Sequence, residues 1–410
     1  MTQRILIENP KKIIFLSFLF FIIIRLVAMY LYADQSLMDE WYEIIKNLAG
    51  DNVAGKKIFA TRIINDVPVP NFFMPPAYPF FIYLIQIIFG NIFLTEIVIF
   101  SQILFSVISI YFLYKILIKF FSKKISYFST FIYAILPINI YSSIIISSSS
   151  FQLSLLVLYF YFLLELIKKE NFSNLFIFSI ITSILVLLRG EFFAFHLLSI
   201  IFLLFKKINY KKVFLSIIIS LILVSPYLIR NYIIFKSISI AKAEGYDLWK
   251  GNNPYAGVEG NMNINLELNK ELKIKIENLE ASNDYDLKVD NLYKDQAIKF
   301  IKDDPSRYLL LYLKKFLSFA FLNFSSNYPG YYNLLHIFPK IFLALGTMIG
   351  FFYLKRKDEF FIFCLIYYLA TLSIFSFFFI LPRYSVSLLP IQFFMISLLL
   401  SKLNLKYFKD

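Results

Sequence analysis

Residues 13–32 read IIFLSFLFFIIIRLVAMYLY, an apolar run with one charged residue, Arg25. A helix rises about 1.5 Å per residue, so about 20 residues cross the roughly 30 Å of hydrocarbon in a bilayer. The run lacks a small-residue cleavage site, so we interpret it as a retained membrane anchor rather than a cleaved signal peptide. The fold then depends on how often such runs recur.

Similar runs fill most of the 410-residue chain, of which 59% is hydrophobic and 17% is charged. Soluble domains are about 45–50% apolar and about 25% charged, so this composition predicts an all-α polytopic membrane protein. Fifty Phe and 29 Tyr suit helices that face lipid and rings placed at the membrane interface. By length we predict about ten transmembrane helices, at residues 12–32, 92–118, 125–141, 151–167, 175–189, 192–205, 213–235, 336–354, 360–381 and 386–402.

Basic residues cluster between these runs and orient them. Cytoplasmic loops carry an excess of Lys and Arg, so we expect the clusters and both termini in the cytoplasm. The same placement accounts for the formal charge of +14, and we expect no nucleic-acid partner. The clusters are Lys11–Lys12, Lys119–Lys124, Lys168–Lys169, Lys206–Lys212 and Lys355–Lys357.

Two further apolar segments fit the outer membrane interface better than a crossing. Residues 77–90 would form only about 21 Å of helix, and counting them as a span would put the basic cluster after residue 115 outside. Residues 308–322 carry Lys314 and Lys315 in mid-segment, and we expect these lysines to snorkel to the interface. Counting both segments would give about twelve spans and reverse the loops between them.

Ten spans leave two long loops on the outside, residues 33–76 and residues 236–307, within a single membrane domain covering residues 1–410. The second loop is the only sizeable polar region. We expect helices near residues 269–281 and 285–303. Asp304-Pro305 has the pattern of an N-cap followed by proline in the first turn of another helix.

Asp39 and Glu40 follow the first span, and an amphipathic helix is expected to begin near Asp39. Carboxyl groups at this depth lose part of their hydration, which raises their pKa and suits a general base. The alternative is that Asp39 only caps the helix and favours its positive end. The residues alone favour neither role.

Arginines occupy the predicted outer turns, against the cytoplasmic bias of basic residues. These are Arg189, Arg230 and Arg383. A guanidinium matches the oxygens of a phosphate, so their convergence on one face indicates a phosphate site. The alternative for each one alone is an arginine that snorkels to the interface. Trp249 offers a ring for stacking on a sugar or for anchoring at the interface.

Histidine and cysteine are scarce. The single cysteine, Cys364, excludes an intrachain disulfide, and His196 and His336 each stand alone in an apolar stretch, which favours a core or interface histidine over a ligand. No spacing of His, Cys or Asp favours a metal site. We therefore expect no cofactor, and nothing in the sequence supports a divalent metal.

Six motifs follow one another along the chain and share the predicted outer side of the membrane: Asp39-Glu40, Pro75-Pro76-Ala77-Tyr78-Pro79, Leu188-Arg189-Gly190-Glu191, Arg230-Asn231, Leu248-Trp249-Lys250-Gly251-Asn252-Asn253-Pro254 and Pro382-Arg383-Tyr384. In this order and on this common side, they are similar to the motifs of bacterial GT-C glycosyltransferases. The likeness is greatest to the branch that includes protein O-mannosyltransferases and the aminoarabinose transferase of lipid A, and it covers almost the whole chain.

This resemblance implies a GT-C fold and a sugar transfer on the outer face of the bacterial cytoplasmic membrane. The donor would be a monosaccharide linked to polyprenyl phosphate, and the acceptor a lipid, a glycan or a protein. Asp39 would take the proton from the acceptor hydroxyl, with Glu40 beside it. Arg383, helped by Arg189 or Arg230, would hold the donor phosphate. Substrate contacts would come from Tyr42, Tyr78, Glu191, Trp249, Asn252, Asn253 and Tyr384.

The chain departs from these relatives at two places. Some relatives carry a basic residue where this chain has Met74, and the candidates to replace it are Lys56, Lys57 and Arg62. Many carry an acidic residue in the turn that here reads Ser147-Ser148-Ser149-Ser150. The second carboxylate of the site is then Glu40 or Glu191, or is missing.

Two other classes of function compete with an inverting glycosyltransferase. A transporter or flippase of lipid-linked sugars predicts internal symmetry, with broken spans at paired positions. The sequence has no such pairing, and its acidic residues concentrate in the predicted outer loops. A non-catalytic assembly subunit would need none of the outer charged groups.

Overall fold

The computed structural model describes residues 10–33, 39–48, 60–64 and 66–403. It describes the backbone alone for residues 10–15, 39, 40, 42, 43, 47, 60–63 and 68. Most of the described chain is helical, and the sheet within it is a two-stranded antiparallel hairpin. The prediction of an all-α polytopic membrane protein is confirmed.

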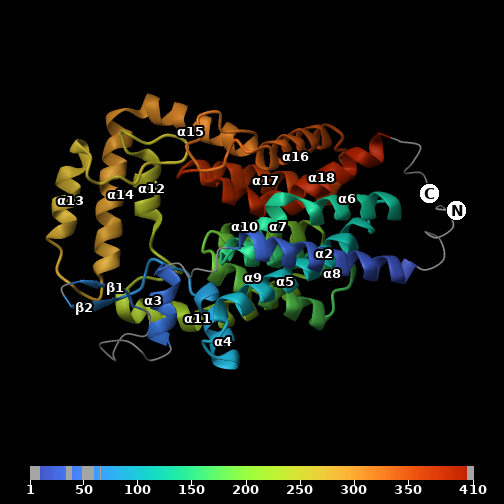
Figure 1. Ribbon diagram of the computed structural model, residues 1–410, viewed down its shortest axis with the longest axis horizontal. Coiled ribbons are helices and arrows are strands. Elements are labelled where there is room, and N and C mark those ends of the chain that lie inside the picture. Colours follow the sequence, from blue (N-terminus) through green and yellow to red (C-terminus); the bar gives the residue numbers. More distant parts are fainter. Residues whose placement is uncertain (1–9, 34–38, 49–59, 65, 404–410) are drawn as a thin grey trace.

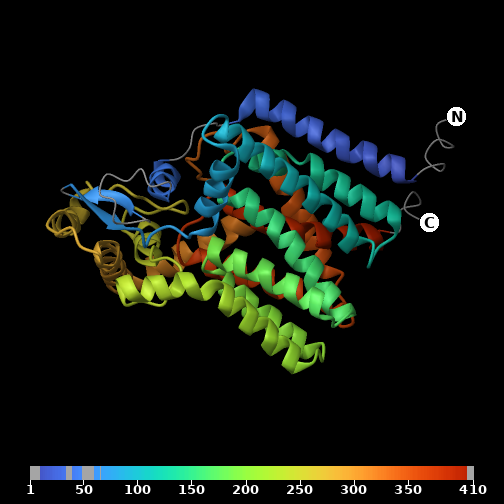
Figure 2. The same cartoon turned by 90° about the horizontal axis from the view of Figure 1, so that it is seen from below.

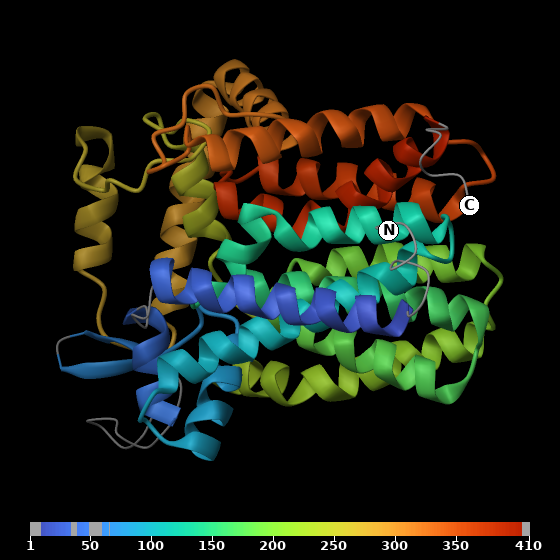
Figure 3. The same ribbon diagram turned by 45° about the vertical axis from the view of Figure 1, so that its right-hand side comes forward.

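A bundle of long helices forms the larger part of the molecule, and these helices run side by side along its long axis (Figures 1 and 3). The apolar runs of the sequence supply them. The bundle consists of α2 (Pro10–Tyr32), α5 (Leu94–Leu117), α6 (Lys123–Ile135), α7 (Pro137–Ile144), α8 (Ser148–Lys168), α9 (Phe172–Leu188), α10 (Phe192–Phe205), α11 (Tyr210–Phe235), α16 (Leu334–Phe352), α17 (Glu359–Ser376), the 3-10 helix η2 (Pro382–Leu388) and α18 (Leu389–Lys402).

Every predicted span coincides with helix. Six segments in the described part of the chain are long and apolar enough to cross a membrane, namely α5, α8, α11, α16, α17 and Pro382–Lys402. Helices α6 and α7 are bent by 52° at their junction and make a seventh if they form one broken span. Leu16–Tyr32, α9 and α10 are shorter apolar helices at the remaining three positions. The count of ten crossings stays a prediction.

A smaller lobe covers one end of the bundle, which we call the lobe end (Figures 1 and 2). The helices predicted near Asp39 and in the second long loop are present, as α3, α13 and α14. The lobe consists of α3 (Asp39–Leu48), β1 (Ala60–Ile64), β2 (Val67–Pro70), α12 (Glu244–Asn252), the 3-10 helix η1 (Glu267–Asn269), α13 (Lys270–Glu277) and α14 (Tyr285–Asp303).

Two helices connect the lobe to the bundle at the positions expected for interface helices. Helix α4 (Ala77–Phe89) buries Tyr78 and Ile82 and exposes Ile87 and Ile88, so it presents an apolar face outward. Helix α15 (Pro305–Ala320) begins as predicted, because the Asp304 side chain accepts a hydrogen bond from the Arg307 amide at 3.1 Å. Their location at the membrane interface stays a prediction.

Lys315 differs from the expectation for α15. Lys314 is exposed, but Lys315 is fully buried, so the prediction that both lysines snorkel to the interface is wrong for Lys315. Its ammonium donates to the Gly251 carbonyl at 2.8 Å and to Asn252 Oδ1 at 3.0 Å. These acceptors lie at the end of α12, so the side chain fastens α15 to the lobe.

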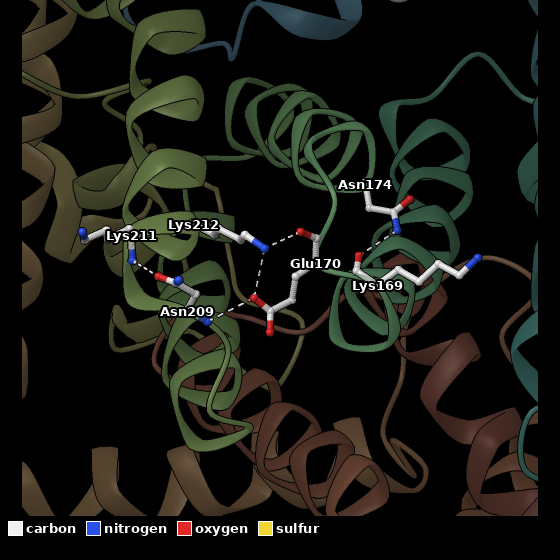
Figure 4. Close-up of polar contacts among 6 residues, drawn as sticks. All are labelled: Lys169, Glu170, Asn174, Asn209, Lys211 and Lys212. Carbon is white, nitrogen blue, oxygen red and sulfur yellow. Dashed lines mark hydrogen bonds and ion pairs between the residues drawn. The ribbon is translucent and has the colours of Figure 1, made fainter.

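The opposite end of the bundle, which we call the far end, carries the basic turns. Figure 4 shows two of them in contact: Glu170, after α8, pairs with Lys212 of α11 at 3.4 Å and accepts from the Asn209 amide. Lys119 pairs with Glu165 at 2.6 Å in the same region. The clusters predicted to face the cytoplasm thus belong to turns that interact with one another.

Arg25, the charge inside the first apolar run, lies in the core rather than at a surface. Its side chain is completely buried, and it donates to the carbonyls of Phe21 and Ala134 and to the hydroxyl of Ser106. Buried polar groups require such partners. Arg25 therefore ties α2 to α5 and α6.

Candidate active site

A tight turn at the lobe end joins α9 to α10 and carries two of the predicted site residues. Arg189 ends α9 and Glu191 precedes α10, and the Phe192 amide donates back to the Arg189 carbonyl at 3.0 Å. The turn brings the two side chains together, with Arg189 Nη1 3.3 Å from Glu191 Oε1. Both side chains remain partly exposed, so neither charge is buried in the core.

Two of the three predicted arginines lie near the ring of Tyr384. The guanidinium of Arg189 lies 5.7 Å from the ring centre and that of Arg383 lies 6.0 Å from it. Cations within about 6 Å of an aromatic face are attracted by the electron-rich ring. The ring is held from behind by Phe375 and Phe379, at 5.3 and 5.8 Å between centres. Arg189, Arg383, Tyr384 and Glu191 therefore form one cluster.

Asp247 of α12 joins this cluster, although the sequence analysis did not single it out. Burial raises the pKa of its carboxyl group to about 7, and the nearby Glu191 and Asp290 add to this shift. Lys250 and Arg189 oppose it. A carboxyl group with a pKa near the working pH can hold or release a proton.

The sequence contains little that would have identified Asp247. Glu244, one turn earlier on the same helix, looks equally suitable, yet it is exposed and lies 3.7 Å from Lys242. Which of the two carboxyl groups approaches the bundle depends on how α12 packs. The only available signal was that Asp247 directly precedes the motif that begins at Leu248.

A cavity adjoins the cluster inside the bundle. Glu191 forms part of its wall together with polar side chains of α8, α17 and η2, namely Gln152, Thr371 and Ser387. Aromatic side chains of α10 and α17 complete it, including Phe195 and Tyr367. Such a mixture of apolar wall and few polar groups is typical of a small-molecule site.

Helix α3, which carries Asp39 and Glu40, contacts the same region through its tryptophan. The ring of Trp41 lies 5.1 Å from that of Tyr78 on α4. Tyr78 is buried and donates to Gln102 Oε1 at 2.6 Å, and the neighbouring Phe81 stacks on Phe151 of α8 at 4.8 Å. Helix α8 also contributes to the cavity wall. Helix α3 is therefore linked to the cavity indirectly, through its contact with α4 and the contact of α4 with α8.

The side chains of Asp39, Glu40 and Tyr42 lie outside the described residues, although the backbone places Asp39 at the start of α3. The same holds for the side chain of Arg62, while Lys56 and Lys57 are outside altogether. Met74 is nearly buried. Ser147, in the turn that lacks the acidic residue of many relatives, caps α8 by accepting from the Ser149 amide at 3.2 Å.

Arg230 binds a different part of the molecule from Arg189 and Arg383. Its Nη1 donates to the Asn71 carbonyl at 2.9 Å and to Asn231 Oδ1 at 2.6 Å. Its guanidinium also lies 5.2 Å from the centre of the Phe235 ring. These contacts attach the segment before α4 to the end of α11.

Trp249 is completely buried rather than presented to a substrate. Its ring packs against Tyr246 and Tyr293, at 6.0 and 4.8 Å between centres, over Leu272 and Ala297. This packing leaves no ring face for a sugar and places Trp249 away from an interface. Trp249 instead supports the helix that holds Asp247.

Asn252 and Asn253 likewise make internal contacts. Asn252 Nδ2 donates to the carbonyls of Leu248 and Phe377, both at 2.8 Å, and Asn253 Nδ2 donates to Asn261 at 2.7 Å. Both side chains are buried. They fix the end of α12 against the bundle, which positions the residues around Asp247.

Among the residues that the structure describes, no group of three or more His, Cys, Asp and Glu side chains is arranged to hold a metal ion. His196 is buried beside the Tyr159 hydroxyl, in line with a core histidine.

The fold and the cluster define a polytopic membrane protein with a charged pocket at one end of its bundle. Residues 74–229 match the sequence model of the family described as dolichyl-phosphate-mannose-protein mannosyltransferase. That family belongs to the GT-C glycosyltransferases, so the match over these residues confirms the resemblance seen in the sequence. The match contains Tyr78, Arg189 and Glu191 and ends just before Arg230. No curated protein matches the chain.

Proposed function

We propose that this protein is an inverting glycosyltransferase that moves a sugar from a polyprenyl-phosphate-linked donor to a lipid, glycan or protein acceptor. The observation that supports this most is the convergence of Arg189 and Arg383 on the Tyr384 ring, beside Glu191 and Asp247. Two arginines around one point are suited to a phosphate, whose oxygens accept hydrogen bonds from each guanidinium.

In the proposed reaction, the acceptor hydroxyl oxygen forms a bond to the anomeric carbon while the bond from that carbon to the phosphate oxygen breaks. The electron pair leaves with the polyprenyl phosphate, and the hydroxyl proton passes to the Asp39 carboxylate, with Glu40 beside it. Displacement in line inverts the anomeric centre. Arg189 and Arg383 stabilise the negative charge that develops on the leaving phosphate.

The contacts of α3 support the assignment of Asp39. Trp41 meets Tyr78, whose helix packs on α8, and Phe73 lies 5.9 Å from Tyr246 on the helix of Asp247. Helix α4 and the segment before it therefore link α3 to α8 and to α12, which hold parts of the candidate site. Tyr42, Glu191 and Tyr384 are the proposed substrate contacts, while Arg230, Tyr78, Trp249, Asn252 and Asn253 act as positioning residues.

We further propose that the lobe end faces the outside of a bacterial cytoplasmic membrane. The basic turns at the far end support this orientation, because cytoplasmic loops are enriched in Lys and Arg. A donor whose prenyl chain stays in the bilayer could then reach the cavity from the side. The acidic and basic groups of the lobe end would meet acceptors on the outer surface.

The test is mass spectrometry of membrane lipids from a strain that lacks the gene. Accumulation of one polyprenyl-phosphate sugar is expected, and it should return to normal when the wild-type gene is restored. Asp39→Asn should insert and accumulate in the membrane like the wild type but fail to restore the profile. Asp295→Asn, at an exposed position on α14, is the matched control and should restore it.

Three results would contradict the proposal or part of it. An unchanged lipid profile in the deletion strain would exclude the donor class. Restoration by Asp39→Asn as complete as that by Asp295→Asn would remove Asp39 from the chemistry. Accumulation confined to the cytoplasmic leaflet would favour the transporter of lipid-linked sugars instead.

A further inference from the structure

A second cavity lies between α7, α15, α16, η2 and α18. Its polar wall consists of His336 and Lys340 of α16, Ser385 of η2 and Gln392 of α18. Ser387, two residues after Ser385, lines the cavity beside Glu191. Helix η2 therefore separates the two cavities, and this one is distinct from the candidate active site.

Two buried polar atoms in this cavity wall have no hydrogen-bond partner, and the ammonium of Lys340 has one. His336 Nδ1 lies 2.7 Å from the Tyr331 carbonyl and so carries a hydrogen, while the buried Nε2 has no hydrogen-bond partner. Gln392 Oε1 is also buried without a partner. The carboxylate of Glu259 acts on Lys340 from beyond 4.0 Å, and within the described part of the chain Lys340 Nζ donates to the Tyr331 hydroxyl at 3.3 Å.

An ammonium with one neutral hydrogen-bond partner and a carboxylate only beyond 4.0 Å is unfavourable in such a place. Removing a charged group from water costs several kcal/mol unless an opposite charge or hydrogen bonds compensate. One neutral hydroxyl at 3.3 Å compensates little. Buried polar groups without partners are uncommon in folded proteins, and a bound ion or ligand is one standard reason for them.

The position of the cavity indicates where its occupant comes from. Helix α16 is one of the six helices able to cross a membrane, and Leu335, Phe338 and Phe342 on it are exposed. Lys340 lies about 9 Å from the start of this helix, by the rise of about 1.5 Å per residue. The cationic wall therefore lies beside an apolar, outward-facing surface, where acyl chains would pack.

We infer that this cavity binds the phosphate headgroup of an anionic membrane lipid. Lys340 donates to the phosphate oxygens, and His336 Nε2 and Gln392 Oε1 accept hydroxyl hydrogens of the headgroup. The acyl chains lie along the exposed face of α16. The inference rests on these contacts alone and holds whether or not the protein transfers sugars.

The test is native mass spectrometry of the whole purified protein, released from micelles after equilibration with phosphatidylglycerol or phosphatidylcholine. Phosphatidylglycerol should be retained in preference to phosphatidylcholine. Lys340→Met should weaken its retention about tenfold, since loss of a charge-assisted hydrogen bond is worth about 1.4 kcal/mol or more. Lys355→Met, an exposed lysine outside the cavity, makes the same charge change and should leave retention unaltered.

Further variants keep the test informative if Lys340→Met does not fold. Lys340→Arg keeps the cation and should retain the lipid, whereas His336→Gln should weaken retention several-fold. Equal retention by Lys340→Met and Lys355→Met would overturn the inference. Displacement of phosphatidylglycerol by millimolar inorganic phosphate would also overturn it, because the site would then take a free anion rather than a lipid.

Discussion

Replacing Lys315 by Met is expected to remove a pH dependence from the stability of the protein. Burial lowers the pKa of the Lys315 ammonium from 10.5 to about 7. Its two acceptors, the Gly251 carbonyl and Asn252 Oδ1, are uncharged. They hold the side chain in place without restoring the preference for the charged form that a carboxylate would give.

The magnitude follows from the difference between the folded and unfolded pKa values. Between pH 7 and pH 10.5 the unfolded chain binds more protons at Lys315 than the folded protein, so the free energy of unfolding rises with pH. Each pH unit inside this window adds about 1.4 kcal/mol. Because Lys315 is half protonated at pH 7 in the folded state, the rise from pH 7 to pH 9 is about 2 kcal/mol.

The assay is thermal unfolding in detergent at pH 7, 8 and 9. The midpoint of the wild type should rise with pH by a few degrees relative to that of Lys315→Met. Lys314→Met, at the exposed neighbouring position, should behave as the wild type does. The reasoning fails if Lys315→Met and the wild type show the same dependence of the midpoint on pH.

Two further predictions concern α12. The rate of the proposed transfer should change about tenfold between pH 6 and pH 8, since the ionised fraction of a group with a pKa of about 7 changes by that much. Asp247→Asn should abolish this limb of the pH profile of the rate, whereas Glu244→Gln should keep it. A limb that survives in Asp247→Asn would assign the titration to another group. In Gly251→Ala the added Cβ would lie 1.9 Å from the Phe378 carbonyl oxygen, so the free energy of unfolding should fall by about 1–3 kcal/mol and the unfolding midpoint should fall with it. Gly257→Ala, where nothing lies within 4 Å of the new atom, should leave the midpoint unchanged. Equal midpoints for both variants would contradict the close packing at Gly251.

The helices could be predicted from the sequence because their signals are local. Length, apolar content and flanking charge identify a span without knowledge of its neighbours. The same applies to α3, whose start at Asp39 was expected, and to α15, whose cap at Asp304 follows from an Asp-Pro pair. The 52° bend between α6 and α7 was not predicted, although Pro137 stands at the break.

The site could be predicted only in part, because its members are defined by packing between distant segments. Arg189 and Arg383 were found from chemistry and order along the chain, and the structure brings both to Tyr384. Trp249 was chosen for its ring, but the ring is buried because α12 packs against α13 and α14. No local pattern in the sequence reveals that packing. Asp247 was missed for the same reason.

The same dependence on packing explains Lys315. A lysine in an apolar helix usually extends to the interface, since its stem is apolar and its charge prefers water. Here two acceptors at the end of α12 lie within 3.0 Å of the ammonium. Those acceptors belong to a segment more than 60 residues earlier in the chain, so the pattern around Lys315 gives no sign of them.

The way the lobe is fastened has a consequence for the ionic strength that the protein tolerates. Raising salt from 0.1 to 1 M shortens the screening length from about 10 Å to about 3 Å and weakens exposed ion pairs. The pairs of the far end, such as Lys212 with Glu170, are of this kind. The contact of Lys315 with the Gly251 carbonyl is buried and joins a charge to a dipole, so concentrated salt should loosen the far end while the lobe stays attached.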